Sequence, residues 1–375
     1  MLVGVSKWRD ELGVVCLADL KVARSNRVSF KAMNIFKYIE KTTNLPSPTA
    51  RELPSAWKGF NFLNMFYIRK NKENHFNEID FKIISDWGFN FVRLPIDYRI
   101  LILGDDWNSI DENAVRMLDD AVEYGIKFNI HTCINFHRAP GYTVAHPPEK
   151  TNLWTEEEPQ KAFAGLWQYL AVRYKNIPNE LLSFNLVNEP ANIDEASYSA
   201  VVKIAANAIW AEDPGRLVIA DGLEYGTIPS DMNFKTGVAQ STRGYQPFTL
   251  THYKAGWVKG SEDYPLPHWP SDEVSFNRTS LFETHFKQWE KLKNSGCGLM
   301  AGEWGAHNRT PHDVVLKWME DCLEIFKSMN IGWSLWNLIG SFGILNSERA
   351  DVVYEDFNGY KLDRKMLDLL LKYVD

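Results

Sequence analysis

Cysteine is scarce in this chain, and its placement argues against two kinds of scaffold. The 375 residues include only four cysteines. They are widely separated, at Cys16, Cys133, Cys297 and Cys322. The sequence contains no C-x-x-C pair and no histidine at zinc-like spacing from a cysteine, so it indicates neither a disulfide framework nor a metal site. We expect buried free thiols.

An excess of positive charge is also missing. The formal net charge is −7, and the Lys and Arg residues form no clustered block. A surface that binds nucleic acid needs such a block, because it must neutralise phosphates. Nucleic acid is therefore not an expected partner, and the charges are interpreted as a solvated acidic surface.

The sequence has no long apolar runs either. No run approaches the roughly 20 apolar residues that cross a bilayer, so no membrane partner is expected. Charged residues interrupt the first 20 positions, which therefore do not read as a signal peptide. Both a secreted and a cytoplasmic location stay open.

Apolar and aromatic side chains, in contrast, are abundant. Hydrophobic residues make up 45% of the chain and aromatic residues 13%, including 14 Trp. This content is ample for a large core. Several Trp residues stand near glycine or proline breaks: Trp57, Trp154, Trp257, Trp269, Trp304 and Trp336. Core packing explains most such residues. A carbohydrate cleft would explain the minority in loops, because a sugar ring can lie flat on an indole face.

Short apolar runs alternate with segments of helical period. The predicted strands are 59–63, 89–94, 127–135, 181–187, 216–220, 248–251, 298–302 and 331–335. The predicted helices are 78–87, 112–124, 159–174, 195–212, 281–295 and 311–329. The alternation predicts an α/β fold with a parallel sheet, and the length fits a (β/α)8 TIM barrel. A doubly wound sheet is the competing architecture, but no G-x-G-x-x-G follows the first strand.

Residues 1–54 stand outside this alternation. They contain one amphipathic helical pattern, Phe30–Thr42, and end in a turn-rich segment with three prolines. We predict an N-terminal extension over 1–54, which packs on the base of the barrel or acts as a linker. The barrel domain is predicted over 55–375.

Two glutamates, 114 positions apart, each follow a strand-like run. Glu189 follows the fourth predicted strand and precedes Pro190, and Glu303 follows the seventh and precedes Trp304-Gly305. Each alone could be a solvated acid or a helix cap. A pair held about 5–5.5 Å apart at the mouth of a barrel is the requirement of retaining glycoside hydrolysis, with one acid/base and one nucleophile.

Five further residues could line the same mouth, although each also has a purely structural explanation. Arg93 could form a structural ion pair or keep a carboxylate ionised. His137 could cap a strand or bind a sugar hydroxyl, and Asn188 could form a turn or hold the 2-hydroxyl. His252 follows the sixth predicted strand. Trp336 could belong to the core, or its ring could form the floor of the subsite that holds the reacting sugar.

Together these motifs resemble glycoside hydrolase family 5, the cellulase family. The resemblance covers residues 57 to about 370. It is carried by Trp57-Lys58-Gly59-Phe60-Asn61, Arg93, His137-Arg138-Ala139-Pro140-Gly141, Asn188-Glu189-Pro190, Gly302-Glu303-Trp304-Gly305 and Trp333-Ser334-Leu335-Trp336-Asn337. It implies a (β/α)8 glycoside hydrolase domain in which Glu189 is the acid/base and Glu303 the nucleophile. It also implies that Arg93, His137, Asn188, His252 and Trp336 bind the attacked sugar.

One position departs from the family pattern. The family carries His-x-Tyr on strand six, with the Tyr hydroxyl bonded to the nucleophile, whereas here Tyr253 directly follows His252. Adjacent side chains of a strand point to opposite faces, so Tyr253 is left out of the predicted site.

The expected activity is retaining, endo-acting cleavage of β-1,4-glucan by a monomer that uses no metal or organic cofactor. Mannanase, xylanase or xyloglucanase, and exo-1,3-β-glucanase activities are alternatives, because loops around the subsites set the choice. A catalytically silent carbohydrate-binding barrel is a further alternative, although a binder has no need of two mutually repelling acids. A metal-dependent barrel hydrolase would need converging ligands, and the nine His form no H-x-H or H-x-x-x-H pair.

Overall fold

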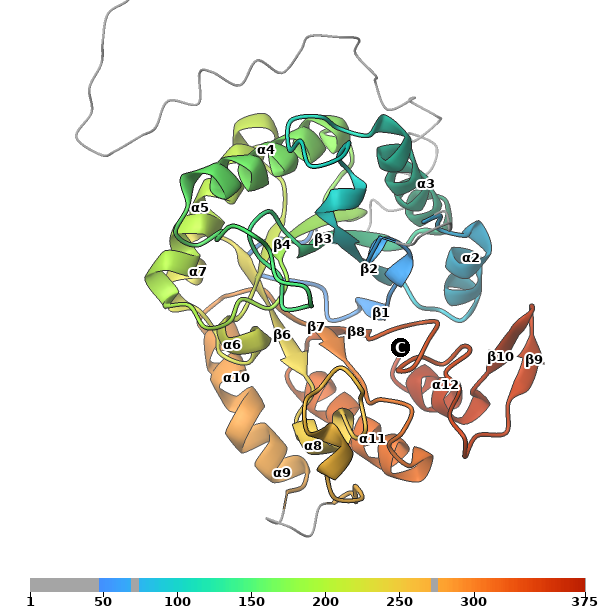
Figure 1. The fold of residues 1–375 in the computed structure, drawn as a ribbon. Coiled ribbons are helices and arrows are strands. Elements are labelled where there is room, and N and C mark those ends of the chain that lie inside the picture. Colours follow the sequence, from blue (N-terminus) through green and yellow to red (C-terminus); the bar gives the residue numbers. More distant parts are fainter. Residues whose placement is uncertain (1–46, 69–73, 271–275, 375) are drawn as a thin grey trace, which may run out of the picture. The chain divides into compact units, whose positions relative to one another are not determined.

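The computed structural model describes residues 47–68, 74–270 and 276–374. Eight parallel strands close into a barrel in sequence order, and helices surround them (Figure 1). The strands are β1 (Lys58–Asn61), β2 (Phe91–Asp97), β3 (His131–Arg138), β4 (Leu182–Val187), β5 (Val218–Asp221), β6 (Ala239–Gly244), β7 (Leu299–Trp304) and β8 (Gly332–Leu335). Pairing of β1 with β8, with Gly59 opposite Ser334, closes the ring. The predicted fold class is confirmed.

The long helices occupy the positions that the helical periodicity predicts. They are α2 (Glu78–Asp86), α3 (Glu112–Phe128), α4 (Glu157–Tyr174), α5 (Glu195–Glu212), α10 (Lys287–Asn294) and α11 (His312–Ser328). The predicted helix 281–295 is in fact α9 (Arg278–Leu281), a π-helical turn (Phe282–Phe286) and then α10. Asp194 caps α5 by accepting from the Ser197 amide at 2.9 Å, which explains why that helix begins where its sequence pattern does.

Shorter helices, turns and strands lie in the loops and near the end of the chain. The helices are α6 (Leu223–Gly226), α7 (Asp231–Thr236), α8 (Phe248–Thr251) and α12 (Arg364–Leu371). The 3₁₀ turns are η1 (Leu63–Met65), η2 (Tyr98–Ile100) and η3 (Ser261–Asp263). A small hairpin joins β9 (Glu355–Phe357) to β10 (Tyr360–Leu362).

The sixth predicted strand is wrong. Residues 248–251 form α8, and the sixth strand is Ala239–Gly244. The residues of β6 are Ala-Gln-Ser-Thr-Arg-Gly, so a search for apolar runs passes over them. They are nevertheless all buried, because their polar groups bond to other polar groups inside the barrel.

The base of the barrel is closed by an apolar cluster. Leu53 and Trp57 pack there against side chains from the strands, with Ala50 beside them. The strand and loop residues of this cluster are Phe91, Cys133, Leu217, Ile219, Ala239 and Met300. The Gly298 amide donates to the Ala50 carbonyl at 2.8 Å, which ties residues 47–54 to the start of β7. Division of the chain at residue 54 stays a prediction, and the predicted helix Phe30–Thr42 lies outside the described residues.

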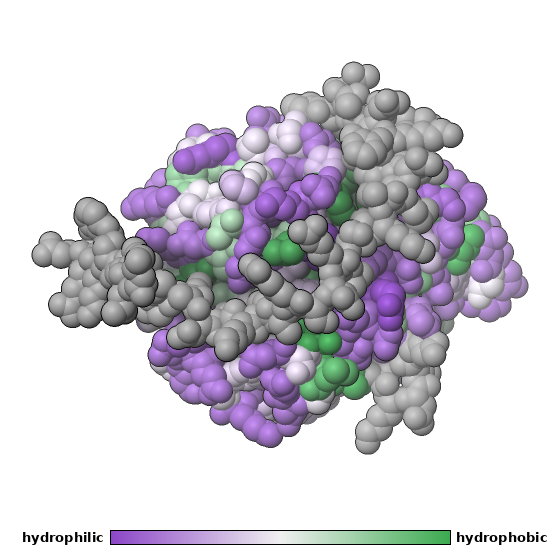
Figure 2. Space-filling model, turned by 90° about the horizontal axis from the view of Figure 1, so that it is seen from above, coloured by the Kyte–Doolittle hydropathy of each residue, from purple (hydrophilic) through white to green (hydrophobic). Residues whose placement is uncertain are grey.

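Three of the four cysteines lie in the described part of the chain. Cys133, Cys297 and Cys322 are buried free thiols, as predicted. No helix in that part is long and apolar enough to cross a membrane. Among the described residues that Figure 2 shows from above, most are hydrophilic, with small separate apolar patches.

Candidate active site

The carboxyl ends of the strands bring charged side chains together inside the mouth of the barrel. Arg93 comes from β2, Arg243 from β6 and Glu303 from β7, while Glu189 follows β4 by two residues. The carboxyl ends of parallel barrel strands share one rim, which is where active sites of this architecture lie. The predicted pair, Glu189 and Glu303, therefore meets at one place.

Glu303 is almost fully enclosed and is held by two hydrogen-bond donors and by an ion pair with a second guanidinium. Arg93 Nη1 lies 2.5 Å from its Oε1, and Arg243 Nη2 lies 3.3 Å from the same atom. The Tyr245 hydroxyl donates to Oε2 at 3.0 Å. The side chain is only 3% exposed, so these donors take the place of water around the carboxylate.

Glu189 has a different environment. Its side chain is 15% exposed, and one oxygen accepts from Arg243 Nε at 3.0 Å. Burial and the negative charge of Glu303 raise the pKa of Glu189 well above the usual range of a glutamate, although Arg243 opposes the shift. The two acids thus differ in environment as an acid/base and a nucleophile do.

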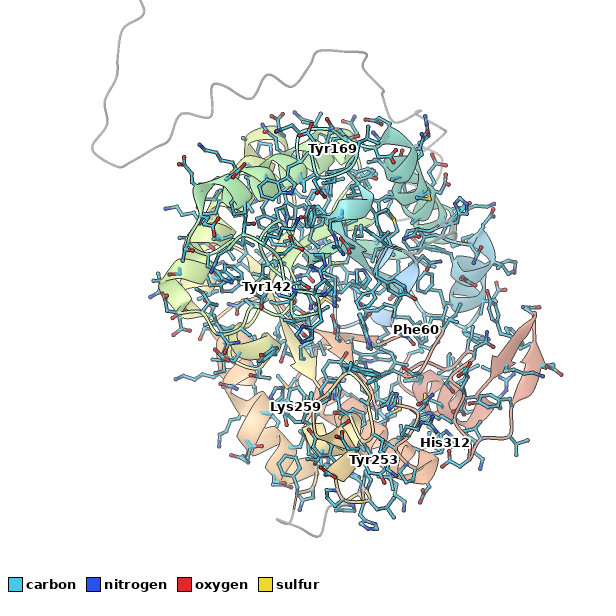
Figure 3. The ribbon with its side chains drawn as sticks, viewed as in Figure 1. Phe60, Tyr142, Tyr169, Tyr253, Lys259 and His312 are labelled. Carbon is cyan, nitrogen blue, oxygen red and sulfur yellow. The ribbon has the colours of Figure 1, made fainter. Side chains whose placement is uncertain are left out.

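The backbone at Glu189 is held in a strained conformation. Its φ of 49° lies in the left-handed region, which side-chain-bearing residues rarely adopt. Its amide donates to Asp221 Oδ2 at 2.9 Å, and its carbonyl accepts from the Tyr142 hydroxyl at 2.7 Å. Tyr142, labelled in Figure 3, comes from the loop after β3. Strain of this kind persists only where the surroundings enforce it, and it clusters at functional sites.

Arg93 connects Glu303 with three asparagines. Its guanidinium donates to Asn61 at 3.0 Å, to Asn185 at 2.8 Å and to Asn188 at 2.9 Å. Because the side chain is 1% exposed and its donors are taken, it acts as a fixed cation at the floor of the site.

Three predicted sugar-binding residues are neighbours. The Asn188 amide nitrogen lies 3.5 Å from His137 Nε2, and the His137 ring stacks on Trp336 with centroids 5.4 Å apart. Phe66 meets His137 edge-on at 4.5 Å. Burial, together with Arg93 and Arg243, lowers the pKa of His137, so its imidazole is neutral at ordinary pH. Among the described residues His137 Nδ1 has no hydrogen-bond partner.

His252 does not follow a strand, because the segment predicted to be its strand is the helix α8. It follows α8 and stacks on Phe248, with centroids 3.9 Å apart. Its Nδ1 lies 3.0 Å from the hydroxyl of Thr251, and its ring meets Tyr245 at 5.2 Å. The structure therefore places His252 against Tyr245, whose hydroxyl bonds Glu303. The binding of the sugar by His252 stays a prediction.

Sequence reasoning missed three residues of this site: Asp221, Arg243 and Tyr245. Arg243 and Tyr245 were missed because the sixth strand was predicted in the wrong place. Arg243-Gly244-Tyr245 stands at the end of the observed β6, where the resemblance predicts His-x-Tyr. A search for R-x-Y at the end of a polar strand would have found them. Asp221 is the last residue of β5, a four-residue strand in which it looks like an ordinary turn acid.

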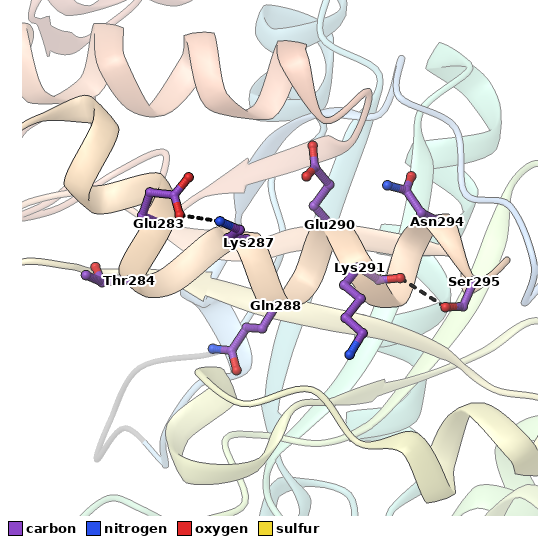
Figure 4. Close-up of a pocket in the computed structure, with 8 residues that line it drawn as sticks. All are labelled: Glu283, Thr284, Lys287, Gln288, Glu290, Lys291, Asn294 and Ser295. Carbon is purple, nitrogen blue, oxygen red and sulfur yellow. Dashed lines mark hydrogen bonds and ion pairs between the residues drawn. The ribbon is translucent and has the colours of Figure 1, made fainter.

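Two other observations delimit the site. A surface hollow lies elsewhere, and its eight lining residues all belong to the helical segment 283–295 (Figure 4). None of them is at a strand end, so the hollow carries none of the chemistry above. Within the described ranges no three His, Cys, Asp or Glu side chains are grouped so that they could hold a metal ion.

A family comparison agrees with this geometry. The family model of cellulase, glycosyl hydrolase family 5, matches residues 54–341.

The chain belongs to glycoside hydrolase family 5.

Individual relatives agree with this family 5 assignment. Endoglucanase C of Acetivibrio thermocellus is 25% identical over 332 residues, which cover 78% of this chain and 92% of the relative. Cellodextrinase A of Ruminococcus flavefaciens is 25% identical over 71% of this chain and 79% of the relative.

Solved structures share the fold. The crystal structure of a glycoside hydrolase superposes with a TM-score of 0.80 and 36% identity, covering 84% of this chain and 98% of the other. Cel5A of Thermotoga maritima, in complex with mannotriose, gives a TM-score of 0.70 at 22% identity over 86% of this chain and 98% of its own. The protein is thus a glycoside hydrolase of family 5 built on a TIM barrel.

Proposed function

We propose that this family 5 protein is a retaining, endo-acting β-1,4-glucanase in which Glu303 is the nucleophile and Glu189 the acid/base. The observation that carries the proposal is that both carboxylates contact one guanidinium, at 3.0 and 3.3 Å from Arg243, in unlike surroundings. Glu303 is enclosed by cationic and phenolic donors. Glu189 is partly open to the cleft and retains its proton to higher pH.

In the first step, an oxygen of Glu303 forms a bond to the anomeric carbon while the bond from that carbon to the leaving sugar breaks. The proton of Glu189 moves to the leaving oxygen. Arg93, Arg243 and Tyr245 hold Glu303, so its attack needs little reorganisation. The products are a glycosyl ester on Glu303 and an ionised Glu189.

In the second step, water enters on the side that the leaving sugar has vacated. Glu189 takes a proton from this water, the water oxygen bonds to the anomeric carbon, and the ester bond to Glu303 breaks. Two displacements at one carbon give net retention, and both carboxyl groups return to their starting states. All these groups come from a single chain, so the proposed mechanism needs no second subunit.

Asn188, His137 and Trp336 are proposed to bind the attacked sugar. Asn188 Oδ1 already accepts from two guanidiniums, so its amide N–H is the group that remains for a hydroxyl. The Trp336 ring is half-buried and stacks on neutral His137, so it can support a pyranose face.

The substrate is assigned from the relatives. Those named above are called endoglucanase and cellodextrinase, and Cel5A of Thermotoga maritima also has a structure in complex with cellobiose. We therefore propose β-1,4-glucan, with mannan, xylan, xyloglucan and 1,3-β-glucan as the competing substrates.

A substrate panel tests the activity directly. Carboxymethylcellulose, barley glucan, mannan, xylan and laminarin are assayed for new reducing ends, with and without chelator. We expect the largest rates on the first two and no effect of chelator. Proton NMR of the earliest product should show the β-anomer, because no water fits between a nucleophile and a sugar in contact. An initial α-anomer would overturn the proposed roles.

Replacement of Glu189 by Ala tests its role separately. An aryl glycoside with a good leaving group hardly needs protonation, so formation of the glycosyl-enzyme should survive much better than polymer hydrolysis. Added azide should then capture the intermediate as a β-glycosyl azide. If azide neither restores rate nor gives this product, Glu189 is not the acid/base.

A further inference from the structure

Arg243 occupies the centre of the carboxylate cluster yet has no donor to offer a sugar. Its Nε donates to Glu189, and its Nη1 donates to the Ser241 hydroxyl at 3.1 Å. Its Nη2 donates to Asn188 at 2.9 Å and to Asp221. Every guanidinium nitrogen is thus engaged within the protein, and the side chain is 1% exposed. Its role lies in organising the site.

Asp221 is the counterpart of Arg243. It is fully buried, and its Oδ2 accepts from both Arg243 Nη2 and the backbone amide of Glu189. Its Oδ1 accepts from the Asn185 amide at 3.0 Å. Asp221 therefore holds Glu189 twice, directly at its strained backbone and indirectly through the guanidinium that bonds its side chain.

The surrounding backbone leaves room for this pair. A Cβ on Gly226, whose φ is +73°, would lie 2.6 Å from Arg243 Cγ. A Cβ on Gly302 would lie 3.2 Å from Arg243 Nη1 and 2.2 Å from the Ser241 hydroxyl. Side chains at these two positions would displace Arg243.

We propose that Arg243 and Asp221 form a charge-compensated pair that positions Glu189 and keeps the site neutral in both states through which the reaction passes. This inference rests on the proposed function. When Glu189 carries its proton, the charges of Arg93 and Arg243 balance those of Asp221 and Glu303. When Glu303 is esterified and Glu189 is ionised, the same two cations balance Asp221 and Glu189. Neither state leaves a buried charge uncompensated.

Because Arg243 and Asp221 have opposite charges, their removal should affect the proton on Glu189 in opposite directions. The ionisable groups that interact with Glu189 come from the loop after β3, from β5, from β6 and the residue after it, and from β7. They are Tyr142, Asp221, Arg243, Tyr245 and Glu303. Arg93 on β2 pairs with Glu303, and His137 on β3 interacts with Arg93 and Arg243. Replacement of Arg243 by Gln removes a cation, so Glu189 should keep its proton to higher pH. Replacement of Asp221 by Asn removes an anion, so Glu189 should lose its proton at lower pH.

The experiment is the pH profile of kcat/KM for hydrolysis of a cello-oligosaccharide, whose alkaline limb reports loss of the Glu189 proton. We expect Arg243→Gln to move this limb upward by about one pH unit and Asp221→Asn to move it downward by about one unit. The double variant should lie between them. Arg243→Lys, which keeps the charge and loses the planar fork, should lower the rate and leave the limb near that of the parent protein.

The proposal would be overturned if the alkaline limb moved in the same direction in both single variants, or moved in neither. A purely structural role would change the rates but would not move the alkaline limbs of the two variants in opposite directions. If Arg243→Gln fails to fold, as judged by circular dichroism and thermal unfolding, the direction of the Asp221→Asn shift decides. The azide test on Glu189→Ala distinguishes failure of the Arg243–Asp221 proposal from failure of the proposed function. Azide capture with unmoved limbs refutes only the Arg243–Asp221 pair, whereas failure of azide capture refutes the proposed function beneath it.

Discussion

The two ends of the barrel interior are built on opposite rules. At the base, apolar side chains including Phe91 and Met300 pack against Leu53 and Trp57. The polar group there, His131, has partners at both ring nitrogens, Glu180 O at 3.1 Å and Ser183 Oγ at 2.7 Å. At the mouth, the guanidiniums of Arg93 and Arg243 and the carboxylates of Asp221 and Glu303 are buried together. The partly exposed Glu189 beside them has a left-handed backbone. The side chains at the base stabilise the fold, whereas the mouth holds strained and charged groups that the chemistry requires.

The largest expected effect is at Glu303. Glu303→Gln should lower turnover by at least about 10³-fold, because an amide cannot form the glycosyl ester. The thermal unfolding temperature should change little, because the amide oxygen can still accept from Arg93 and the amide N–H can donate to the Tyr245 hydroxyl. Activity is measured on carboxymethylcellulose with protein expressed free of the parent enzyme.

A matched control for this change is Glu157→Gln, at the start of α4, where the side chain is 67% exposed and pairs with Lys161 in the adjacent turn. It should retain full turnover, since exposed pairs contribute little. Residual activity of Glu303→Gln above a few per cent would remove Glu303 from the role of nucleophile.

At the base, Phe91→Ala should show the opposite pattern. Phe91 is fully buried and stacks on His131 with ring centroids 5.4 Å apart. Removal of its ring leaves a cavity and should lower the free energy of unfolding by about 3–5 kcal/mol, which denaturant titration can measure. Turnover per folded molecule should stay within about twofold of the parent, because the mouth is untouched. A tenfold loss would break the division between base and mouth.

The difference between the ends also explains which features sequence reasoning could reach. Seven of the eight strands could be predicted from their apolar runs, and α5 could be predicted from its regular period. The sixth strand was missed because most of its side chains are polar. Gln240, Ser241, Thr242 and Arg243 are buried among polar partners, a condition that no local hydrophobic pattern records.

The candidate site divides in the same way. Glu189 and Glu303 follow apolar strands, so their positions could be read along the chain. The contacts of Asp221 join β5 to a backbone amide beyond β4 and to Arg243 on β6, and only the closed barrel brings these three together. Sequence patterns predict elements well and predict partnerships between distant polar residues poorly.

Tyr245→Phe should give a smaller loss at the mouth. Its hydroxyl donates to Glu303 at 3.0 Å, and a hydrogen bond to a charged group contributes about 1.5–3 kcal/mol, which corresponds to roughly 10- to 100-fold in turnover. Burial and Glu303 raise the pKa of Tyr245, so the phenol remains a donor throughout the working pH range. The kinetic constants on cello-oligosaccharides measure the loss.

Tyr253→Phe is the matched control for that change. Tyr253 is the tyrosine adjacent to His252, and it is buried behind the site, 7% exposed. Its variant should keep turnover near that of the parent. Equal losses from the two variants would mean that Tyr245 has no special relation to the nucleophile.

The smallest effect is expected from Ile219→Val in the basal cluster. Ile219 is fully buried on β5, two positions before Asp221. It therefore lies on the same strand as a residue of the mouth, but at the apolar end of that strand. Loss of one methylene group should reduce the free energy of unfolding by about 0.5–1.5 kcal/mol. The pH profile of kcat/KM should not move, because no charge near Glu189 changes. A shifted alkaline limb would show that packing at the base reaches Asp221 along the strand, and that the two ends of the barrel are mechanically coupled.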